Sequence, residues 1–94
     1  MTTYDPSIAP EYQPRVPTPD EEPAAYIRWR IANRIPAERL ERLPTPEEEP
    51  DAAVRRRIAV RIPVEWLGRV PTPDEEPNEY VRWQIASRIK ENAR

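Results

Sequence analysis

The chain has 94 residues, of which 34% are charged and 37% are hydrophobic, and its formal net charge at pH 7 is −2. This length allows one small domain, and the charge provides no basic field that would draw the chain to nucleic acid or to a membrane. The absence of Cys excludes disulfides and thiolate chemistry, and the absence of His removes the commonest metal ligand and the usual general base. We therefore expect no cofactor and no metal.

The N-terminal stretch 1–14 is predicted to be irregular. It has neither the basic start nor the apolar core of a signal peptide, and no run of about 18 apolar residues in the chain would span a bilayer. The sequence therefore predicts a cytoplasmic protein without membrane contact. Three prolines exclude a continuous helix within the stretch, so we expect it to cap the N-terminal end of the domain.

An internal repeat follows. RVPTPDEEP at 15–23 returns as RLPTPEEEP at 42–50 and again as RVPTPDEEP at 69–77, a constant shift of 27 residues. A period of this size is typical of arrays in which each unit buries its apolar face against its neighbours. The predicted divisions are an N-terminal cap formed by a partial repeat, two full repeats, and a truncated third repeat that ends in a polar cap, at 1–14, 15–41, 42–68 and 69–94.

The proline-rich segment marks the boundary between units. Pro17 and Pro19 end the preceding element and force an extended turn. Thr18 and Glu21 have the spacing of a capping box, which predicts one isolated turn. The long helix is then expected to start afresh at Pro23, because a proline this deep in a helix begun earlier would lack the N–H that the helix needs.

Each unit is predicted to contain a long helix and then a short one, with the long helices at 23–35, 50–62 and 77–90. In the first, Ile27 and Ile31 lie on one apolar stripe and Trp29 on an adjoining one, so this helix should pack against more than one neighbour.

The short elements follow Pro36 and Pro63, residues that suit the first position of a helix. They are brief enough for 3₁₀ geometry to be an open alternative. The side chains expected to seal the core after the long helices are Leu40, Leu43, Trp66, Leu67 and Val70.

Two stretches, AAVRRRIAVRIPVEWLGRV and EYVRWQIASRI, resemble the leucine-rich variant repeat and related HEAT-like repeats. The matching positions in the first copy are Ile27-Arg28, Ile31-Ala32, Pro36 and Leu40, and the third copy departs from the pattern with Lys90 in place of the proline. The resemblance implies an all-α, short right-handed α-solenoid of three 27-residue helix–short-helix repeats with Pro-rich turns. It also implies an interaction scaffold without enzymatic activity.

In HEAT-like repeats an acidic residue often stands six positions before this Arg, and the two form a ladder between units. A Glu is also favoured at a helix N-terminus, where it can accept charge-assisted hydrogen bonds from the Arg of an adjacent unit. The residues expected in this structural ladder are Glu22, Arg28, Glu49, Arg55, Glu76 and Arg82.

The candidate binding surface comes from equivalent positions on successive long helices. Trp29, Arg56 and Trp83 are expected to form a row in which the guanidinium lies between two indoles, and a parallel row of two tyrosines dips at Ala53. Aromatic residues and Arg commonly anchor protein interfaces. The other interpretation is that the tryptophans cover the seam between helices and are structural. The predicted surface comprises Tyr26, Trp29, Arg30, Ala53, Arg56, Arg57, Tyr80 and Trp83.

The acidic clusters DEE, EEE and DEE do not predict catalysis, because the same cluster is present in all three copies and has no nucleophile partner at a matching place. We therefore expect a non-enzymatic interaction or assembly module that binds a protein partner or itself, as a homo-oligomer. One alternative is a nucleic-acid-binding repeat that uses Arg and Trp, which the negative net charge disfavours. Another is a designed repeat protein without a biological function.

Overall fold

The structure, a computed structural model, describes residues 4–93. Over this range every regular element is helical and no strand is formed, so the prediction of an all-α chain is confirmed. Three α-helices alternate with three short 3₁₀ helices, labelled η. In chain order the elements are η1 Pro10–Tyr12, α1 Ala25–Arg34, η2 Ala37–Leu40, α2 Ala52–Arg61, η3 Val64–Trp66 and α3 Glu79–Asn92.

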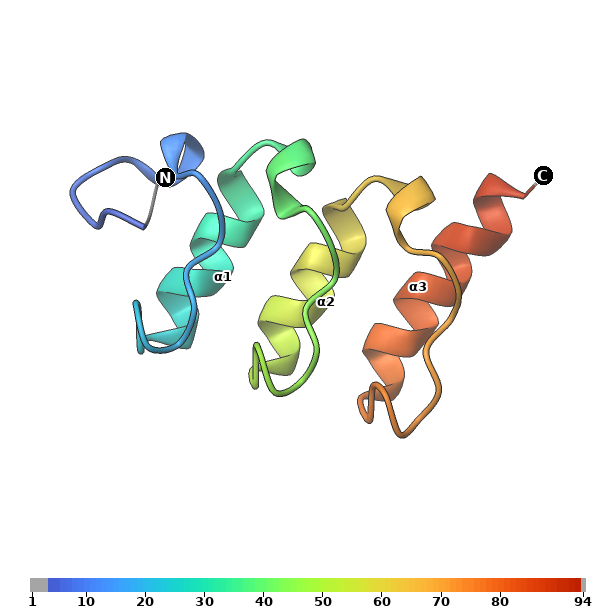
Figure 1. Cartoon of the computed structure of the whole chain (residues 1–94). Helices are drawn as coiled ribbons and strands as arrows, with labels where there is room; N and C mark the ends of the chain where they lie inside the picture. Colours follow the sequence, from blue (N-terminus) through green and yellow to red (C-terminus); the bar gives the residue numbers. More distant parts are fainter. Residues whose placement is uncertain (1–3, 94) are drawn as a thin grey trace.

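The three α-helices lie side by side in chain order and run in the same direction (Figure 1). α1 packs against α2, and α2 packs against α3. After each 3₁₀ helix the chain returns along the helices to the end where the next α-helix begins (Figure 1). The N-terminal segment, with η1, lies beside α1 on the side away from α2 (Figure 1). Within residues 4–93, no helix combines the length and the apolar character needed to cross a membrane.

Each α-helix begins two residues later than the sequence predicts, and hydrogen bonds explain the difference in α2. The Glu49 carboxylate accepts the N–H of Asp51 at 3.0 Å, which holds Asp51 extended at φ −84 and ψ 116. Asp51 then caps the helix, because its side chain accepts the N–H groups of Ala53 and Val54. The acidic residue before the proline therefore sets the point at which the helix starts.

The turn that precedes each helix contains the predicted capping box. Glu21 Oε1 accepts the N–H of Thr18 at 2.9 Å, and Thr18 Oγ1 accepts the N–H of Glu21 at 3.3 Å. The same reciprocal bonds recur in the other two turns. The segment is therefore an ordered turn with its own hydrogen bonds.

The core lies between the α-helices and the segments that return along them. Its buried members are Ile31, Ala32, Ile35, Leu40, Val54, Ile58, Ala59, Ile62, Val81 and Ile85. Leu43 and Leu67 are half-buried against the core, as expected, but Trp66 and Val70 are 43% and 40% exposed, so their assignment to the core was wrong. In the turn of η3, Leu67 packs against the core, and Trp66 directly before it is exposed.

One residue after η2 has an unusual backbone conformation. Glu41 has φ 62 and ψ −71, and the N–H of Arg42 donates to the carbonyl oxygen of Leu40 at 2.7 Å. This is a γ-turn of the rare, strained type. One unit later the equivalent residue is Gly68, with φ 70. Glycine adopts positive φ without a steric penalty.

Replacing Glu41 by Gly is expected to increase the free energy of unfolding by about 1 kcal/mol, since relief of about 1–3 kcal/mol of strain outweighs the entropy that glycine loses on folding. Urea denaturation measures the change. Glu38→Gly, in η2, provides the control and should destabilise the protein. If Glu41→Gly were equally destabilising, the γ-turn would not be strained.

Candidate functional site

A buried ion pair joins the first two units. Arg28 on α1 donates from Nε to Glu49 Oε1 at 2.7 Å and from Nη2 to Glu49 Oε2 at 2.8 Å. The two residues are only 3% and 4% exposed. Nη1 of Arg28 also donates to the carbonyl oxygens of Glu22 and Pro23, at 2.8 and 3.0 Å. The bonds from Arg28 to Glu49 raise the pKa of the guanidinium.

The same arrangement joins the second and third units. Arg55 bonds to both carboxylate oxygens of Glu76 at 2.7 and 2.8 Å, and its Nη1 donates to the carbonyl oxygen of Glu49 at 2.8 Å. The structure thus brings the sequence-predicted ladder residues together as Arg28–Glu49 and Arg55–Glu76. Such fully buried, bidentate pairs are closed to a ligand, and their role is to bind one unit to the next.

The remaining two ladder residues lie at the outer ends of the array. Glu22 receives no guanidinium among residues 4–93, and its Oε1 accepts the hydroxyl of Tyr4 at 3.2 Å. Arg82 donates through Nη1 to the carbonyl oxygen of Glu76 at 2.6 Å. The three Glu of the ladder are equivalent in the repeat, and so are the three Arg. Among residues 4–93 the structure pairs Arg28 with Glu49 and Arg55 with Glu76, and leaves Glu22 and Arg82 without such a pair.

A second set of ion pairs lies within the turns and was not predicted. Arg15 binds Glu21 through two bonds of 2.7 Å, and Arg42–Glu48 and Arg69–Glu75 repeat the pair. The bonds from Arg15, together with the Thr18 N–H, lower the pKa of Glu21 to about 2, and Glu48 and Glu75 are affected alike. The turn Arg and the turn Glu are identical in all three copies and stand six residues apart. This constant spacing is the signal from which the ion pairs could have been predicted.

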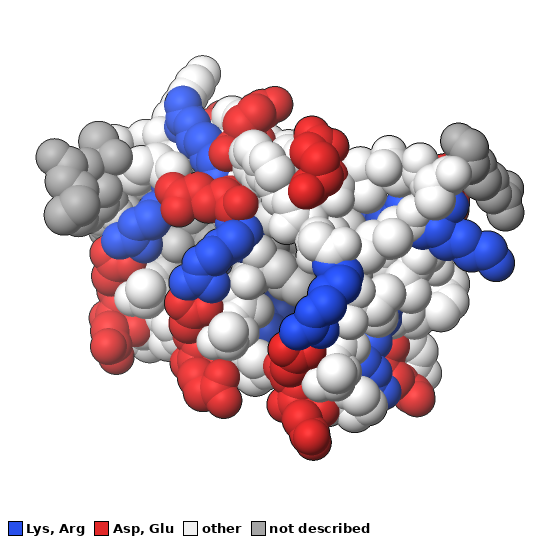
Figure 2. Space-filling model, turned by 45° about the vertical axis from the view of Figure 1, so that its right-hand side comes forward, with Lys and Arg blue, Asp and Glu red and all other residues white. Residues whose placement is uncertain are grey.

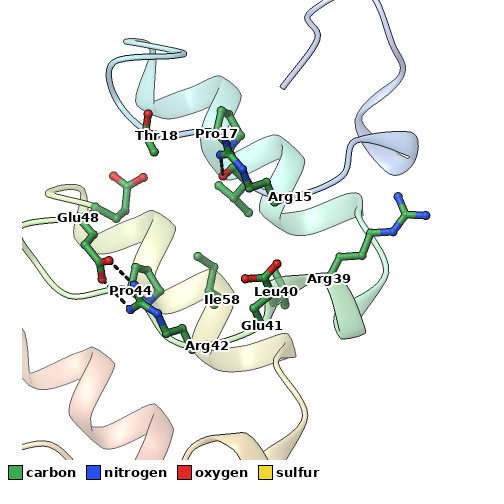
Figure 3. Close-up of a pocket in the computed structure, with 12 residues that line it drawn as sticks. Arg15, Pro17, Thr18, Arg39, Leu40, Glu41, Arg42, Pro44, Glu48 and Ile58 are labelled. Atoms are coloured by element: carbon green, nitrogen blue, oxygen red, sulfur yellow. Dashed lines mark hydrogen bonds and ion pairs between the residues drawn. The ribbon is translucent and has the colours of Figure 1, made fainter. Parts of the chain in front are cut away.

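The turns also enclose hollows between successive return segments. The first has a volume of 270 Å³, with Leu40 and Ile58 among its lining residues and Arg15 and Arg42 beside it (Figure 3). A hollow of 320 Å³ in the next pair of return segments has Leu43, Leu67 and Arg69 in its lining. These hollows lie in successive pairs of return segments, and Arg15, Arg42 and Arg69 in their linings are already paired with Glu. We therefore assign the hollows to the packing between the repeats.

The sequence-predicted binding residues form a separate surface, here called the outer helix face. It consists of Tyr26, Trp29, Arg30, Ala53, Arg56, Arg57, Tyr80 and Trp83. Trp29 and Arg57 are half-buried and the other six are exposed. The exposed fractions of Tyr26, Tyr80 and Trp83 are 68%, 60% and 61%. Of the four aromatic residues in this set, only Trp29 packs against a buried apolar cluster of the described residues.

The aromatic contacts on this face differ from the expected row. Arg57 lies over the ring of Trp29 with 5.3 Å to the centroid, and Arg56 lies over the ring of Tyr80 with 5.9 Å. The expectation that Arg56 stacks between Trp29 and Trp83 was wrong. Parallel neighbouring helices face each other with different sides, so equivalent positions on two helices do not meet.

A hollow of 550 Å³ opens on the outer helix face, with Arg56, Glu79, Tyr80 and Trp83 in its lining. Residues of both α2 and α3 therefore contribute to it. The equivalent positions one unit earlier are Trp29, Ala52, Ala53 and Arg56, which have a different chemistry. This hollow is therefore particular to one junction, unlike the hollows between the turns.

Charge is divided between the turns and the helices. α1 and α2 contain several Arg but neither Asp nor Glu, whereas the turns hold the acidic clusters. Figure 2 shows acidic side chains along the lower edge of the molecule, with basic side chains directly above them. The turn arginines are neutralised locally, so the unpaired positive charge lies on the helices.

Over residues 4–93, no three side chains of the types that bind metals come together. No family model matches the chain, and no curated protein or solved structure is significantly similar to it. The resemblance to leucine-rich variant and HEAT-like repeats therefore stays a prediction, and the candidate function has to be argued from the geometry alone.

Proposed function

We propose that the chain is a short, right-handed α-solenoid that serves as a non-enzymatic interaction module, binding an acidic segment of a protein partner on its outer helix face. The regular helix–3₁₀ alternation and the two equivalent buried ion pairs support the solenoid, since each unit then contacts its neighbours in the same way. The observation that carries the binding function is the hollow beside Arg56, Tyr80 and Trp83.

Variation among the copies supports this location. Twelve of the 27 columns are identical in all three copies, and they include the ladder Arg and Glu, the turn Arg and Glu, and the core isoleucines. The positions of Tyr26, Trp29 and Arg30 vary instead, reading Ala53, Arg56 and Arg57 in the second copy and Tyr80, Trp83 and Gln84 in the third. Identical columns maintain the array, which leaves the variable exposed columns for recognition.

The chemistry of the surface indicates the kind of segment that fits. Arg30 and Arg56 are exposed cations on helices without carboxylates, so a bound segment should offer Asp or Glu to them. The exposed rings of Tyr80 and Trp83 flank the hollow and suit an apolar side chain. Rigid aromatic side chains and Arg are the residue types that supply most binding energy in protein interfaces.

Selection of binders from a random peptide display library tests this function. We expect the selected peptides to combine acidic with apolar residues, and their affinity to fall by about tenfold or more for Trp83→Ala or Tyr80→Ala. The matched control is Tyr12→Ala, since Tyr12 is an equally exposed aromatic residue on η1. Peptides that bound Trp83→Ala and Tyr80→Ala as well as the unchanged protein would place the binding site elsewhere.

Single-stranded nucleic acid is the second candidate, because Arg56 and the exposed rings also suit phosphate contacts and base stacking. The acidic turns and the net charge of −2 oppose it. A labelled oligonucleotide titrated at low salt and at about 200 mM salt separates the two, since phosphate contacts are strongest at low salt. Without binding at low salt this candidate is excluded.

A further inference from the structure

Arg82 carries only part of the bonding pattern of the two buried arginines. Its Nη1 donates to the carbonyl oxygen of Glu76 at 2.6 Å, as Nη1 of Arg55 donates to that of Glu49 at 2.8 Å. Among residues 4–93, no carboxylate bonds to Nε or Nη2 of Arg82, the two groups through which Arg28 and Arg55 hold a Glu. α3 therefore presents a guanidinium that is already oriented for a carboxylate.

Glu22 is the complementary group at the other end of the array. Its Oε2 accepts the N–H of Ala24 at 3.0 Å, as Oε2 of Glu49 accepts the N–H of Asp51 at 3.0 Å. Glu22 therefore bonds to the backbone in the same way as a carboxylate that receives a buried Arg. Within the part of the chain that the structure describes, its Oε1 accepts one hydrogen bond, from the hydroxyl of Tyr4 at 3.2 Å, which is long for a hydrogen bond between two oxygens.

The apolar surfaces at the two ends are complementary as well. At the junction of α2 and α3, Ala59 packs in one buried cluster with Val81 and Ile85. The equivalent of Ala59 on α3 is Ala86, and the equivalent of Val81 on α1 is Ile27. Both are only half-buried, although Ala59 and Val81 are fully buried. Ala86 on α3 and Ile27 on α1 are thus less covered than the equivalent residues that meet at the junction of α2 and α3.

We infer that a second copy of this chain docks head to tail on the free side of α3, with Arg82 of one copy bonded to Glu22 of the next. The contact has the chemistry of the α1–α2 and α2–α3 junctions, including a place for Trp83 against Arg30 of the next copy, as the equivalent residues meet between α1 and α2. A head-to-tail contact leaves both outer ends free, so assembly continues into open chains of copies.

The N-terminal segment competes with this contact. Residues 4–9 stand beside α1 on the side away from α2 (Figure 1), and Tyr4 packs against the apolar cluster formed with α1. Docking of a second copy therefore displaces this segment from Glu22. The exchange replaces one long hydrogen bond from a neutral donor by a bidentate pair between two charged groups, which is the stronger interaction.

This end surface shares Trp83 and Arg30 with the outer helix face, whereas Arg82 and Glu22 belong to the end surface alone. Substitutions at Arg82 consequently test assembly without altering the hollow beside Tyr80. Tyr80→Ala tests the hollow and leaves the Arg82–Glu22 contact in place. The failure of one proposal is thus distinguishable from the failure of the other.

Sedimentation velocity of the full chain, from micromolar to millimolar concentration, tests the inference. We expect the mass of the unchanged protein to rise with concentration, and Arg82→Glu and Glu22→Arg each to stay monomeric, because losing a buried charged partner weakens such a contact about 100-fold or more. Mixing the two variants should restore assembly, since Glu at 82 meets Arg at 22. Circular dichroism verifies that both variants remain helical.

Two further variants sharpen the test. Lys90→Glu makes the same charge change at an exposed site on α3 and should assemble like the unchanged protein. Tyr4→Phe keeps the ring but frees Glu22 from the hydroxyl, so assembly should begin at lower concentration. The inference is overturned if the unchanged protein and the mixture both keep the mass of one chain at every concentration, or if Arg82→Glu assembles as the unchanged protein does.

Discussion

Replacing Glu49 by Gln is expected to lower the free energy of unfolding by about 3–5 kcal/mol, the usual cost of removing one partner from a buried ion pair. The amide has nearly the same shape, but it brings an N–H group against the Arg28 guanidinium and removes the compensating charge. Small domains are stable by only about 5–15 kcal/mol in total, so the loss is a large share. Urea denaturation followed by circular dichroism measures it.

The neighbouring residue supplies a matched control. Glu48 forms a bidentate pair with Arg42, but its side chain is 43% exposed. Glu48→Gln retains an oxygen that can accept the Thr45 N–H, and an exposed pair contributes only about 0–1 kcal/mol. We expect a loss of less than about 1 kcal/mol. Equal losses in the free energy of unfolding for Glu48→Gln and Glu49→Gln would mean that burial does not determine how much these ion pairs contribute to stability.

Replacing both partners separates the cost of a stranded charge from the value of the pair. Arg28→Met with Glu49→Leu leaves no uncompensated charge, and apolar replacements of buried pairs are often neutral. Here the carbonyl oxygens of Glu22 and Pro23 also lose the donor that Arg28 provided, but both bonds are only part-buried, so each loss costs less than the about 1–3 kcal/mol of a fully buried group left unsatisfied. The double variant should therefore be more stable than Glu49→Gln but less stable than the unchanged protein.

Truncating Ile62 to Ala is expected to destabilise the protein by about 2–5 kcal/mol. Ile62 follows α2 directly, is fully buried, and belongs to the cluster that α1, α2 and the return segments share. The substitution removes apolar contacts and leaves a cavity that the surrounding helices cannot close without moving. The shift of the urea midpoint, at unchanged slope, measures the loss.

Ile89 is the matched control, since it is the same residue one unit later. On α3 it is only half-buried against the smaller cluster, so Ile89→Ala should cost about half as much or less. If Ile89→Ala were as costly as Ile62→Ala under monomeric conditions, burial would not explain the loss. The comparison thus tests how far the packing at α3 is completed within a single chain.

The repeat made much of the fold predictable. The 27-residue shift located the boundaries, and the Thr18–Glu21 spacing predicted a capping box whose two bonds the structure contains. The helix starts could not be placed as well, because the residues after the prolines are held extended by local bonds from their N–H groups to the carboxylates of Glu49 and its equivalents. Propensity alone does not reveal such bonds.

The sequence predicted which residues form the candidate site, but it did not predict which of them contact one another. Exposure of Tyr26 and Tyr80 follows from their places opposite the buried stripe, whereas Trp83 is exposed although the equivalent Trp29 is half-buried. The stacking partners depend on which side of each helix faces its neighbour. The side with Trp29 faces the following helix, and the side with Arg57 faces the preceding one, a relation that requires the direction and spacing of the helices in addition to their sequence.

The bridging guanidiniums have a consequence for how the chain unfolds. Arg28 holds carbonyl oxygens of its own unit and the carboxylate of the next, so neither unit can melt without breaking bonds of the other. Coupling of this kind between nearest neighbours makes a linear array lose structure cooperatively, with the outermost helices opening first. α2, which packs against α1 on one side and α3 on the other, is then expected to be the last element to open.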